Sequence, residues 1–259
     1  MTQAAIVLDN VTKAFGDGAR PALDRVSLRV PARQFLAVVG PSGSGKTTLL
    51  RLINRLTDQG EGRVLVEGRD ARDVDPIALR RRIGYVFQGI GLFPHMTVAE
   101  NIAITPRLMG WDDKRRGGRV NKLLKLVRLP QKYRGRLPSE LSGGERQRVG
   151  VARALAAEPK IVLMDEPFGA LDALTRDALG RDVRALHDKL RLTTVMITHD
   201  LTEAVLLADR VVVIHQGRLI EDATPKALMT SPRHAYVREL VETPRRQAER
   251  LGALVGKRP

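Results

Sequence analysis

A glycine-rich segment directly after a short apolar run is the feature that most restricts how this chain can fold. The run Phe35–Val39 leads into Gly40, Pro41, Ser42, Gly43, Ser44, Gly45, Lys46, Thr47 and Thr48. This order predicts a strand, a tight turn and a helix; the turn would point backbone N–H groups at an anion, and the helix would add its positive N-terminal end. Lys46 can reach the outer phosphates of a nucleoside triphosphate, and the Thr47 hydroxyl can ligate magnesium. The segment therefore predicts a triphosphate site.

Two adjacent acids after another apolar run predict the second half of this site. Asp165 and Glu166 directly follow the run Ile161–Met164. Beside a phosphate-binding loop, the carboxylate of Asp165 can hold a magnesium ion directly or through water. Glu166 can act as general base toward the water that attacks the terminal phosphate. An acid pair that only caps a turn is the alternative, and the loop at Gly40 favours the magnesium site.

A second candidate anion site is predicted where a helix begins in the middle of the chain. Ser142 is a good N-cap residue, and Gly143 and Gly144 leave their backbone amides open in the first helical turn. An ordinary capped helix would begin in the same way. Taken alone, this segment therefore leaves both interpretations open.

Composition and charge limit the classes of partner. The 259 residues carry a formal net charge of +15 and include no cysteine, which excludes disulfides and cysteine-ligated metal sites. We expect a soluble or peripheral protein, because no apolar stretch approaches the ~18 to 20 residues of a membrane span and no signal peptide is recognisable. Aromatic residues make up only 3% of the chain, which disfavours nucleic acid as the partner. An arginine-rich surface and attraction to an anionic membrane both stay open.

The apolar pattern predicts an α/β fold with a mainly parallel sheet, because most of the apolar runs alternate with helices and are apolar on both faces. We expect strands at 6–11, 23–30, 35–39, 63–67, 160–164, 193–198, 211–214 and 218–220. The first two predict an N-terminal antiparallel β subdomain with a turn at Gly16, Gly18 and Pro21. Helical periodicity predicts an inserted helical subdomain over about 89–158. Other helices are expected at 47–54, 173–190, 201–208 and in the tail from residue 224.

Taken together and in this order, the motifs resemble those of the ATP-binding cassette ATPases, the nucleotide-binding subunits of ABC transporters. The resemblance extends from about Ile6 to Pro232 and rests on GPSGSGKTT, LSGGERQRVGVARAL, IVLMDEP, Ala170–Asp172 and Thr198–Asp200. It implies a P-loop NTPase core over 1–232, with the helical insertion, and a helical tail over 233–259. About 35 residues follow Thr224, too few for the paired ligand-sensing repeats found in some relatives, so we expect no regulatory domain.

The resemblance also implies roles for single residues. Phe15 would stack on adenine, and Gln88 would ligate magnesium and couple to the membrane subunits. Ser142, Gly143 and Gly144 would contact the γ-phosphate of ATP bound by a second copy of the chain, and Asp172 would line the interface. His199 would hold the γ-phosphate and orient the attacking water. The remaining histidines lie outside the motifs, and we interpret them as structural: His95, His187, His215 and His234.

The same resemblance predicts an ATP hydrolase that uses ATP and Mg²⁺. Its catalytic residues would be Lys46, Glu166 and His199, and its magnesium ligands would be Thr47, Gln88 and Asp165. Because each signature segment in the family serves the ATP of a partner, we expect a head-to-tail dimer that closes on ATP. The family also implies two integral membrane permease subunits, a solute-binding protein that acts indirectly, a peripheral location on the cytoplasmic face of the inner membrane, and no nucleic acid.

Two further segments resemble those of ATPases that serve osmoprotectant importers, namely Leu52–Leu56 and Arg82–Asn101 with its continuation to Trp111. The implied solutes are quaternary amines such as glycine betaine, choline and carnitine. Import of amino acids or another small solute is the first alternative, and a soluble cassette ATPase acting on nucleic acid or ribosomes is a distant one. Two positions depart from the family pattern: Arg33 replaces a turn glycine, at an expected small cost in stability, and Gly89 replaces a polar residue.

Overall fold

A mainly parallel sheet lies at the centre of the structure, a computed structural model that describes residues 4–16 and 19–255. The six-stranded sheet has the order β10-β9-β3-β8-β7-β6. Every neighbouring pair is parallel except β9 with β10. The strands are β3 (Phe35–Val39), β6 (Ile83–Val86), β7 (Ile161–Asp165), β8 (Thr193–Thr198), β9 (Arg210–His215) and β10 (Arg218–Ala223). The predicted turn residue Gly18 and residues 256–259 of the predicted tail lie outside the described residues.

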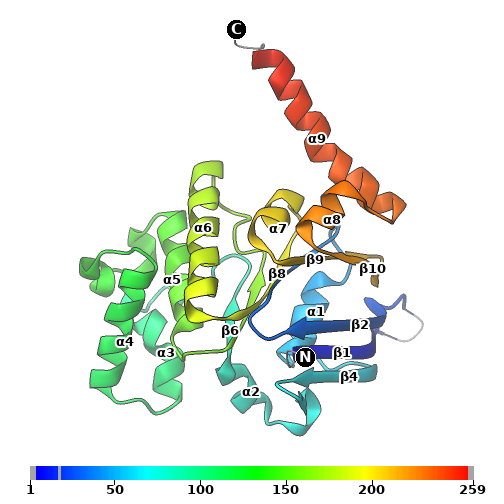
Figure 1. The fold of residues 1–259 in the computed structure, drawn as a ribbon. Coiled ribbons are helices and arrows are strands. Elements are labelled where there is room, and N and C mark those ends of the chain that lie inside the picture. Colours follow the sequence, from blue (N-terminus) through cyan, green and yellow to red (C-terminus); the bar gives the residue numbers. More distant parts are fainter. Residues whose placement is uncertain (1–3, 17–18, 256–259) are drawn as a thin grey trace.

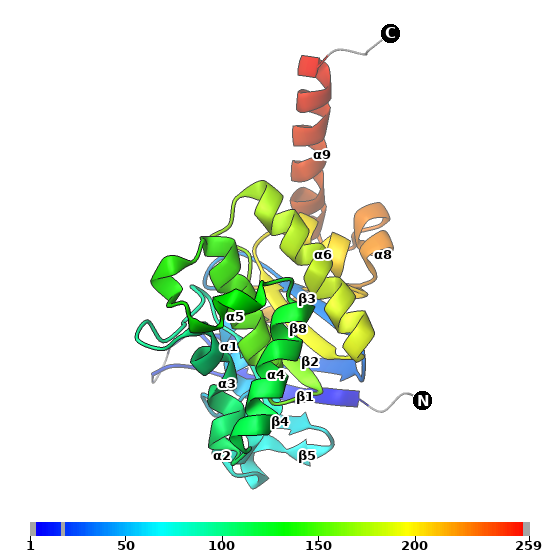
Figure 2. The ribbon, with the colours of Figure 1, turned by 90° about the vertical axis from the view of Figure 1, so that its left-hand side faces the viewer.

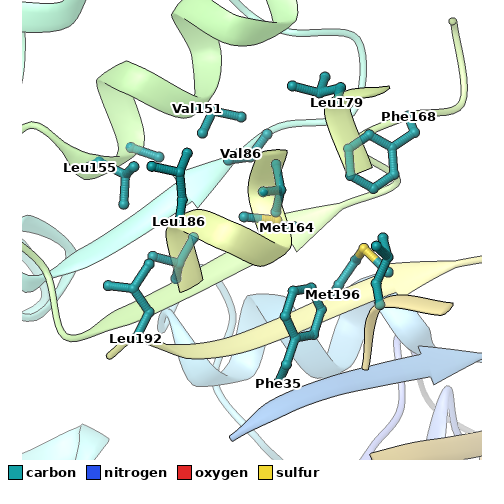
Figure 3. Close-up of a cluster of buried hydrophobic side chains, with 14 of the residues drawn as sticks. Phe35, Val86, Val151, Leu155, Met164, Phe168, Leu179, Leu186, Leu192 and Met196 are labelled. Atoms are coloured by element: carbon teal, nitrogen blue, oxygen red, sulfur yellow. The ribbon is translucent and has the colours of Figure 1, made fainter. Parts of the chain in front are cut away.

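The central strands are buried on both faces, which is why their sequences are apolar runs without alternation. Successive side chains of a strand point to opposite faces and therefore enter two different hydrophobic clusters. In β3, Phe35 and Ala37 belong to one cluster, whereas Leu36 and Val38 belong to the other. Figure 3 shows part of the first cluster, where Phe35 of β3, Met164 of β7 and Met196 of β8 meet helical side chains.

The predicted N-terminal antiparallel subdomain is confirmed as a four-stranded sheet of order β2-β1-β4-β5. Its strands are β1 (Ala4–Lys13), β2 (Leu23–Pro31), β4 (Glu61–Val66) and β5 (Arg69–Asp70). In β2 buried and exposed residues alternate, as expected for a sheet with one face toward solvent. The buried face shares the second hydrophobic cluster with helix α1 (Lys46–Ile53), which lies between this sheet and the central one.

A group of helices occupies one side of the molecule (Figures 1 and 2). Helices α3 (Val98–Leu108), α4 (Asp113–Leu126) and α5 (Gly143–Leu155) fall within the predicted helical insertion. Short 3₁₀ turns at Gln131–Gly135 and Pro138–Glu140 connect α4 to α5. These helices share the first hydrophobic cluster with the central sheet, so they do not enclose a separate core. The boundaries of the insertion at 89 and 158 stay a prediction.

The remaining helices follow the last strands of the central sheet. They are α6 (Ala173–Leu190), α7 (Leu201–Leu207), α8 (Pro225–Thr230) and α9 (Ala235–Val255). Helix α9 is anchored at its start by the buried Val237 and Val241, and it then runs away from the body of the molecule (Figure 1). None of the helices in the described part of the chain has the length and apolar character of a membrane span.

Two features near residue 80 were not expected from the sequence. Helix α2 (Pro76–Arg82) is capped by Asp75, whose carboxylate accepts from the Ala78 N–H at 2.7 Å, and it has proline at its first position. Strand β6 follows it and completes the sheet beside β7. At four residues including a glycine, β6 has too short an apolar pattern to be recognised alone. Arg33, which replaces a turn glycine of the family pattern, has a φ of 67°, in the left-handed region that side chains disfavour. The expected small cost in stability stays a prediction.

Candidate functional site

The glycine-rich loop joins β3 to α1 and is pressed closely against neighbouring backbone. A Cβ atom on Gly40 would lie 2.1 Å from the Ile214 carbonyl oxygen, and one on Gly45 would lie 2.2 Å from that of Ala22. Gly43 and Gly45 also have φ values of 75° and 106°. Only glycine combines these conformations with such contacts. The turn between β3 and α1 is therefore fixed by sequence in the shape that suits an anion at the helix N-terminus.

Lys46 directs its charge back onto this loop. Its Nζ donates to the carbonyl oxygens of Gly40 at 2.8 Å and Pro41 at 2.9 Å, and the residue is only 5% exposed. Burial lowers the pKa of the Lys46 ammonium, while the carboxylates of Glu166 and Asp165 oppose that shift. The result is a desolvated cation held at the mouth of the loop, where it can meet a phosphate.

Asp165 lies at the end of β7 beside the loop and has two hydroxyl partners. The Thr47 hydroxyl lies 3.5 Å from Oδ1 of Asp165, and the Tyr85 hydroxyl donates to its Oδ2 at 3.2 Å. Burial raises the pKa of the Asp165 carboxyl, and the Tyr85 hydrogen bond partly counters the effect. Burial and the Asp165 charge in turn raise the pKa of the Tyr85 phenol.

The pair of Thr47 and Asp165 fits a magnesium ion by its chemistry. Magnesium prefers hard oxygen ligands, takes one or two from the protein, and keeps water or phosphate oxygens for the rest. Within the described ranges, no group of three or more His, Cys, Asp or Glu residues is arranged to hold a metal by itself. The described residues therefore contain no site in which such side chains alone would surround a metal ion. The Thr47 hydroxyl and an Asp165 carboxylate oxygen do lie next to each other, as a shared magnesium ion would require.

Glu166 is the point where three of the predicted site residues meet. Its Oε2 accepts from Gln88 Nε2 at 3.3 Å and lies 3.3 Å from His199 Nδ1. The three residues follow strands β6, β7 and β8, whose carboxyl ends share one edge of the parallel sheet. Glu166 has a φ of 43°, a strained value for a residue with a side chain, and its N–H donates to the Ile197 carbonyl at 3.0 Å. Backbone strain at this carboxylate is typical of a functional position.

The predicted signature segment begins helix α5 with a capping box. Ser142 Oγ accepts from the Glu145 N–H at 3.2 Å, and the Glu145 carboxylate accepts from the Ser142 N–H at 2.8 Å. The hydrogen bond from the Ser142 backbone holds the pKa of Glu145 below its usual value. A Cβ atom on Gly144 would lie 2.5 Å from the Thr175 Cγ2 of α6, so a side chain there would require Thr175 or one of the two helices to shift.

Phe15 and Asp172 lie outside the group around Glu166. Phe15 is 57% exposed, with Lys13 Nζ 5.1 Å from its ring centroid. Asp172 caps α6 by accepting from the Thr175 N–H at 3.0 Å, and this hydrogen bond lowers the pKa of its carboxyl. Within the described residues, 4–16 and 19–255, no hydrogen bond or ion pair joins Glu166 to Phe15, to Asp172 or to the Ser142 hydroxyl.

Tyr85 is a member of the site that was not predicted from the sequence. It was included only in the segment that resembles osmoprotectant ATPases, without a role. The signal that identifies it is its place on β6: two residues after the strand begins at Ile83, it lies beside β7 and its hydroxyl reaches Asp165. Without strand β6, that placement could not be inferred.

The family model, the similar sequences and the similar solved structures all indicate the same family. The sequence model of the family described as "ABC transporter" matches residues 23–169. The choline transport ATP-binding protein OpuBA of Bacillus subtilis is 43% identical over 260 residues, which cover 98% of this chain and 68% of that protein. The glycine betaine/carnitine/choline transport ATP-binding protein OpuCA of the same species is 45% identical over 90% of this chain and 61% of its own length. The chain thus spans about two thirds or less of these two relatives.

A relative with a different solute in its name is equally similar. The sulfate/thiosulfate import ATP-binding protein CysA of Burkholderia mallei is 46% identical over 91% of this chain and 67% of its own length. Among solved structures, the dimeric structure of MJ0796, described as a bacterial ABC transporter cassette, has a TM-score of 0.77 at 34% identity. The match covers 85% of this chain and 98% of that one. A second structure of that cassette, in a post-hydrolysis state bound to ADP and Pi, matches equally well. The chain therefore belongs to the ABC transporter family, as one of its ATP-binding proteins.

Proposed function

We propose that this chain hydrolyses ATP and thereby drives a membrane importer. The observation that carries the proposal is the position of Glu166, which contacts Gln88 and His199 beside the loop that holds Lys46. The loop amides and Lys46 would bind the phosphates. Glu166 would accept a proton from the attacking water, and His199 would hold that water and the terminal phosphate in place.

A magnesium ion, when bound, would neutralise charge on the phosphates. Thr47 and Asp165 would hold the ion. Gln88, which lies at the same edge of the sheet and donates to Glu166, would be its third protein ligand. The desolvated Lys46 and the loop amides would supply the rest of the positive potential, which is the main way in which proteins accelerate phosphoryl transfer. Phe15, whose ring is exposed, would stack on the adenine.

Two substitutions test this proposal. Glu166→Gln removes the base but keeps the shape, so we expect kcat for ATP hydrolysis to fall by a factor of about 10² or more, while ATP still binds. Lys46→Ala removes the phosphate cation, and both ATP affinity and turnover should fall. Glu61→Gln, an exposed change on β4, serves as the control and should keep wild-type turnover. Wild-type rates in Glu166→Gln would contradict the proposed role of the carboxylate.

The signature segment supports a dimeric working unit. Gly143 and Gly144 present their amides at the first turn of α5, and among the residues described the segment Ser142–Gly144 has no polar contact with this chain's own Glu166. We infer that it meets the triphosphate held by a second copy, so that two chains enclose ATP head to tail, and that Asp172 lines their interface. The similar MJ0796 cassette, whose solved structure is dimeric, supports this arrangement. The importer would add two integral membrane permease subunits and place the chain on the cytoplasmic face of the inner membrane.

For the solute, we propose quaternary amines such as glycine betaine, choline or carnitine. Support comes from the names of relatives that include choline, carnitine and glycine betaine transport proteins. The alternative of another small solute is represented by CysA at similar identity. In vesicles that contain the chain with its permease subunits and a solute-binding protein, glycine betaine or choline should stimulate ATP hydrolysis. Stimulation by sulfate or amino acids alone would favour the alternative.

A role on nucleic acid is the remaining alternative, because the net charge is +15. Such binding would weaken steeply as salt rises. We expect no binding of RNA or DNA at physiological ionic strength, since the family's membrane subunits, rather than nucleic acid, are the proposed partners. Salt-dependent retention on nucleic acid, with no association with membrane proteins, would reverse this choice.

A further inference from the structure

The loop that follows Gln88 has an unusual backbone. Gly89, Ile90 and Gly91 have φ values of 74°, 72° and 53°, so three successive residues lie in the left-handed region. This costs glycine little, but Ile90 is β-branched, and such a residue rarely adopts a positive φ because of steric clash. A conformation of this kind persists only where the surrounding structure holds it. Something other than the loop's own preference must therefore maintain it.

Helix α5 supplies the contacts that hold this segment. Arg153 donates from Nη1 to the Gly91 carbonyl at 2.7 Å and from Nη2 to the Ile90 carbonyl at 3.0 Å. Its guanidinium also lies 5.7 Å from the ring centroid of Phe87, on the other side of Gln88. One turn earlier on α5, a Cβ atom on Gly150 would lie 3.7 Å from Ile90 Cγ2, an ordinary van der Waals distance. Helix α5 thus holds the carbonyls of the strained segment through Arg153, and its Gly150 faces the Ile90 side chain.

The surroundings of Arg153 indicate that its main polar partners are the carbonyls of Ile90 and Gly91. The residue is 7% exposed. Burial lowers the pKa of its guanidinium, and within the described part of the chain no carboxylate lies close enough to oppose that effect. A buried cation is costly unless its N–H groups are satisfied. Here the acceptors are the carbonyls of the strained segment. Their hydrogen bonds offset the cost of burying the guanidinium, and the guanidinium in turn holds the segment in its strained conformation.

The two ends of this arrangement are parts of the proposed site. Helix α5 begins at the N-cap Ser142, and eleven residues of helix correspond to about 16 Å between it and Arg153. At the other end, Gln88 precedes the strained segment and donates to Glu166 at 3.3 Å. Gly143 and Glu166 also line one cavity of about 80 Å³, together with Gly89. A shift of α5 would therefore reach Gln88 through Arg153.

We propose that Arg153 is a positioning residue that holds Gln88 against Glu166 through the strained segment and so links the signature helix to that carboxylate. The inference rests on the proposed function, because it treats Glu166 as the general base. Arg153 itself does not contact the triphosphate. When the start of α5 meets the phosphate held by a second chain, the rigid helix transmits its position to the residue that orients Glu166.

The test uses a conservative substitution, a rescue and a matched control on the full chain. Arg153→Lys keeps the charge but loses the two-pronged geometry, so kcat for ATP hydrolysis should fall about tenfold, with KM and ATP affinity within about twofold of wild type. Ile90→Gly, added to Arg153→Lys, should recover at least about threefold in kcat, because glycine adopts a positive φ without clash. Arg119→Lys is the control, because Arg119 also donates to two carbonyls, those of Leu155 and Ala156, at 2.6 and 3.0 Å.

The control is expected to keep wild-type kcat, since Arg119 donates to carbonyls at the C-terminal end of α5 and, among the described residues, makes no hydrogen bond to Gly89–Gly91. Hydrogen exchange on the folded proteins adds a measurement independent of turnover: a peptide spanning residues 87–93 should exchange faster in Arg153→Lys than in Arg119→Lys. The inference is overturned if Arg153→Lys turns over like wild type, if Ile90→Gly gives no recovery, or if the exchange of this peptide is unchanged. Failure of the proposed function looks different, because wild type would then match Glu166→Gln.

Discussion

Two residues near the proposed catalytic carboxylate adopt backbone conformations that their side chains disfavour. Glu166 has a φ of 43° and Ile90 a φ of 72°, and both lie within the group around the proposed catalytic carboxylate. Strain of this kind costs about 1–3 kcal/mol per residue and is retained where the surrounding structure requires it. Because the proposed general base is itself strained, the geometry of the site depends on the strands and on the helix that hold these loops.

The surroundings of the buried His187 predict that stability depends on pH. It is 3% exposed, its Nδ1 lies 2.9 Å from the Thr194 hydroxyl, and its ring packs on Phe35. Burial lowers the pKa of His187 below its ordinary 6.5, and the nearby Arg184 adds to the effect. Below pH 6.5 the unfolded chain therefore takes up a proton that the folded one resists, so stability is full above that pH and falls as the pH drops toward the folded-state value.

We expect the free energy of unfolding to decrease below about pH 6.5 with a contribution of at most ~1.4 kcal/mol per pH unit from this group. Urea unfolding of wild type and His187→Gln across pH 5 to 8 measures it, and the variant should lack this contribution. His95→Gln, at an exposed histidine, should follow the wild-type curve. Equal pH slopes for wild type and His187→Gln would show that His187 does not carry the effect.

The residues show which parts of the site were accessible from sequence. The glycine loop was predictable because its φ values and close backbone approaches admit glycine alone, and the motif fixes their spacing. A small cost in stability at Arg33 was predicted only because the resembling family has glycine in that turn. Tyr85 could not be assigned a role, because its partnership with Asp165 depends on β6 lying beside β7. The hydrogen bond from Arg153 to the Ile90 carbonyl joins residues 63 positions apart. A local sequence pattern therefore could not predict it.

At the scale of elements, helices α5 and α6 are joined by a buried carboxylate. Asp182 of α6 accepts from Arg148 of α5 at 2.6 Å and pairs at 3.1 Å with Arg128, which follows α4. The Asp182 side chain is only 7% exposed. It therefore ties the helical insertion to the helix that covers the sheet. The contact could not be foreseen from the sequence, because it depends on how α6 packs against α5 and the end of α4.

Asp182→Asn removes the charge that two arginines share, and we expect the free energy of unfolding to fall by about 2–4 kcal/mol, because it leaves the largely buried Arg148 without its carboxylate. Asp177→Asn is the matched control on the same helix, since it breaks the exposed pair with Arg181. That change should cost less than about 0.5 kcal/mol. Urea denaturation of both variants gives the two values, and similar losses in both would refute the role given to Asp182.

For the whole molecule, a composite site predicts that two inactive variants restore each other. Lys46→Ala lacks a working loop, and Ser142→Arg blocks the signature segment. Each alone should be inactive. A random mixture forms mixed dimers in which one site combines an intact loop with an intact signature, so hydrolysis should return to about a quarter of the wild-type rate.

The measurement is steady-state ATP hydrolysis at fixed total protein while the mixing ratio is varied. Activity should peak at equal amounts of the two variants and vanish at both extremes. A mixture of two preparations of Lys46→Ala controls for concentration. If the mixed sample stays inactive while circular dichroism shows both variants folded, each chain completes its own site and the head-to-tail arrangement is wrong.

The central sheet has one more consequence, which concerns how such a protein can diverge. Each strand sends alternate side chains into two hydrophobic clusters on opposite faces, and Figure 3 shows only one of them. Substitutions on opposite faces share backbone but few atomic contacts, so their effects on folding should approximately add. The residues of either cluster can therefore change during evolution without compensating replacements in the other. The loops at the carboxyl edge of the sheet would keep their relative positions.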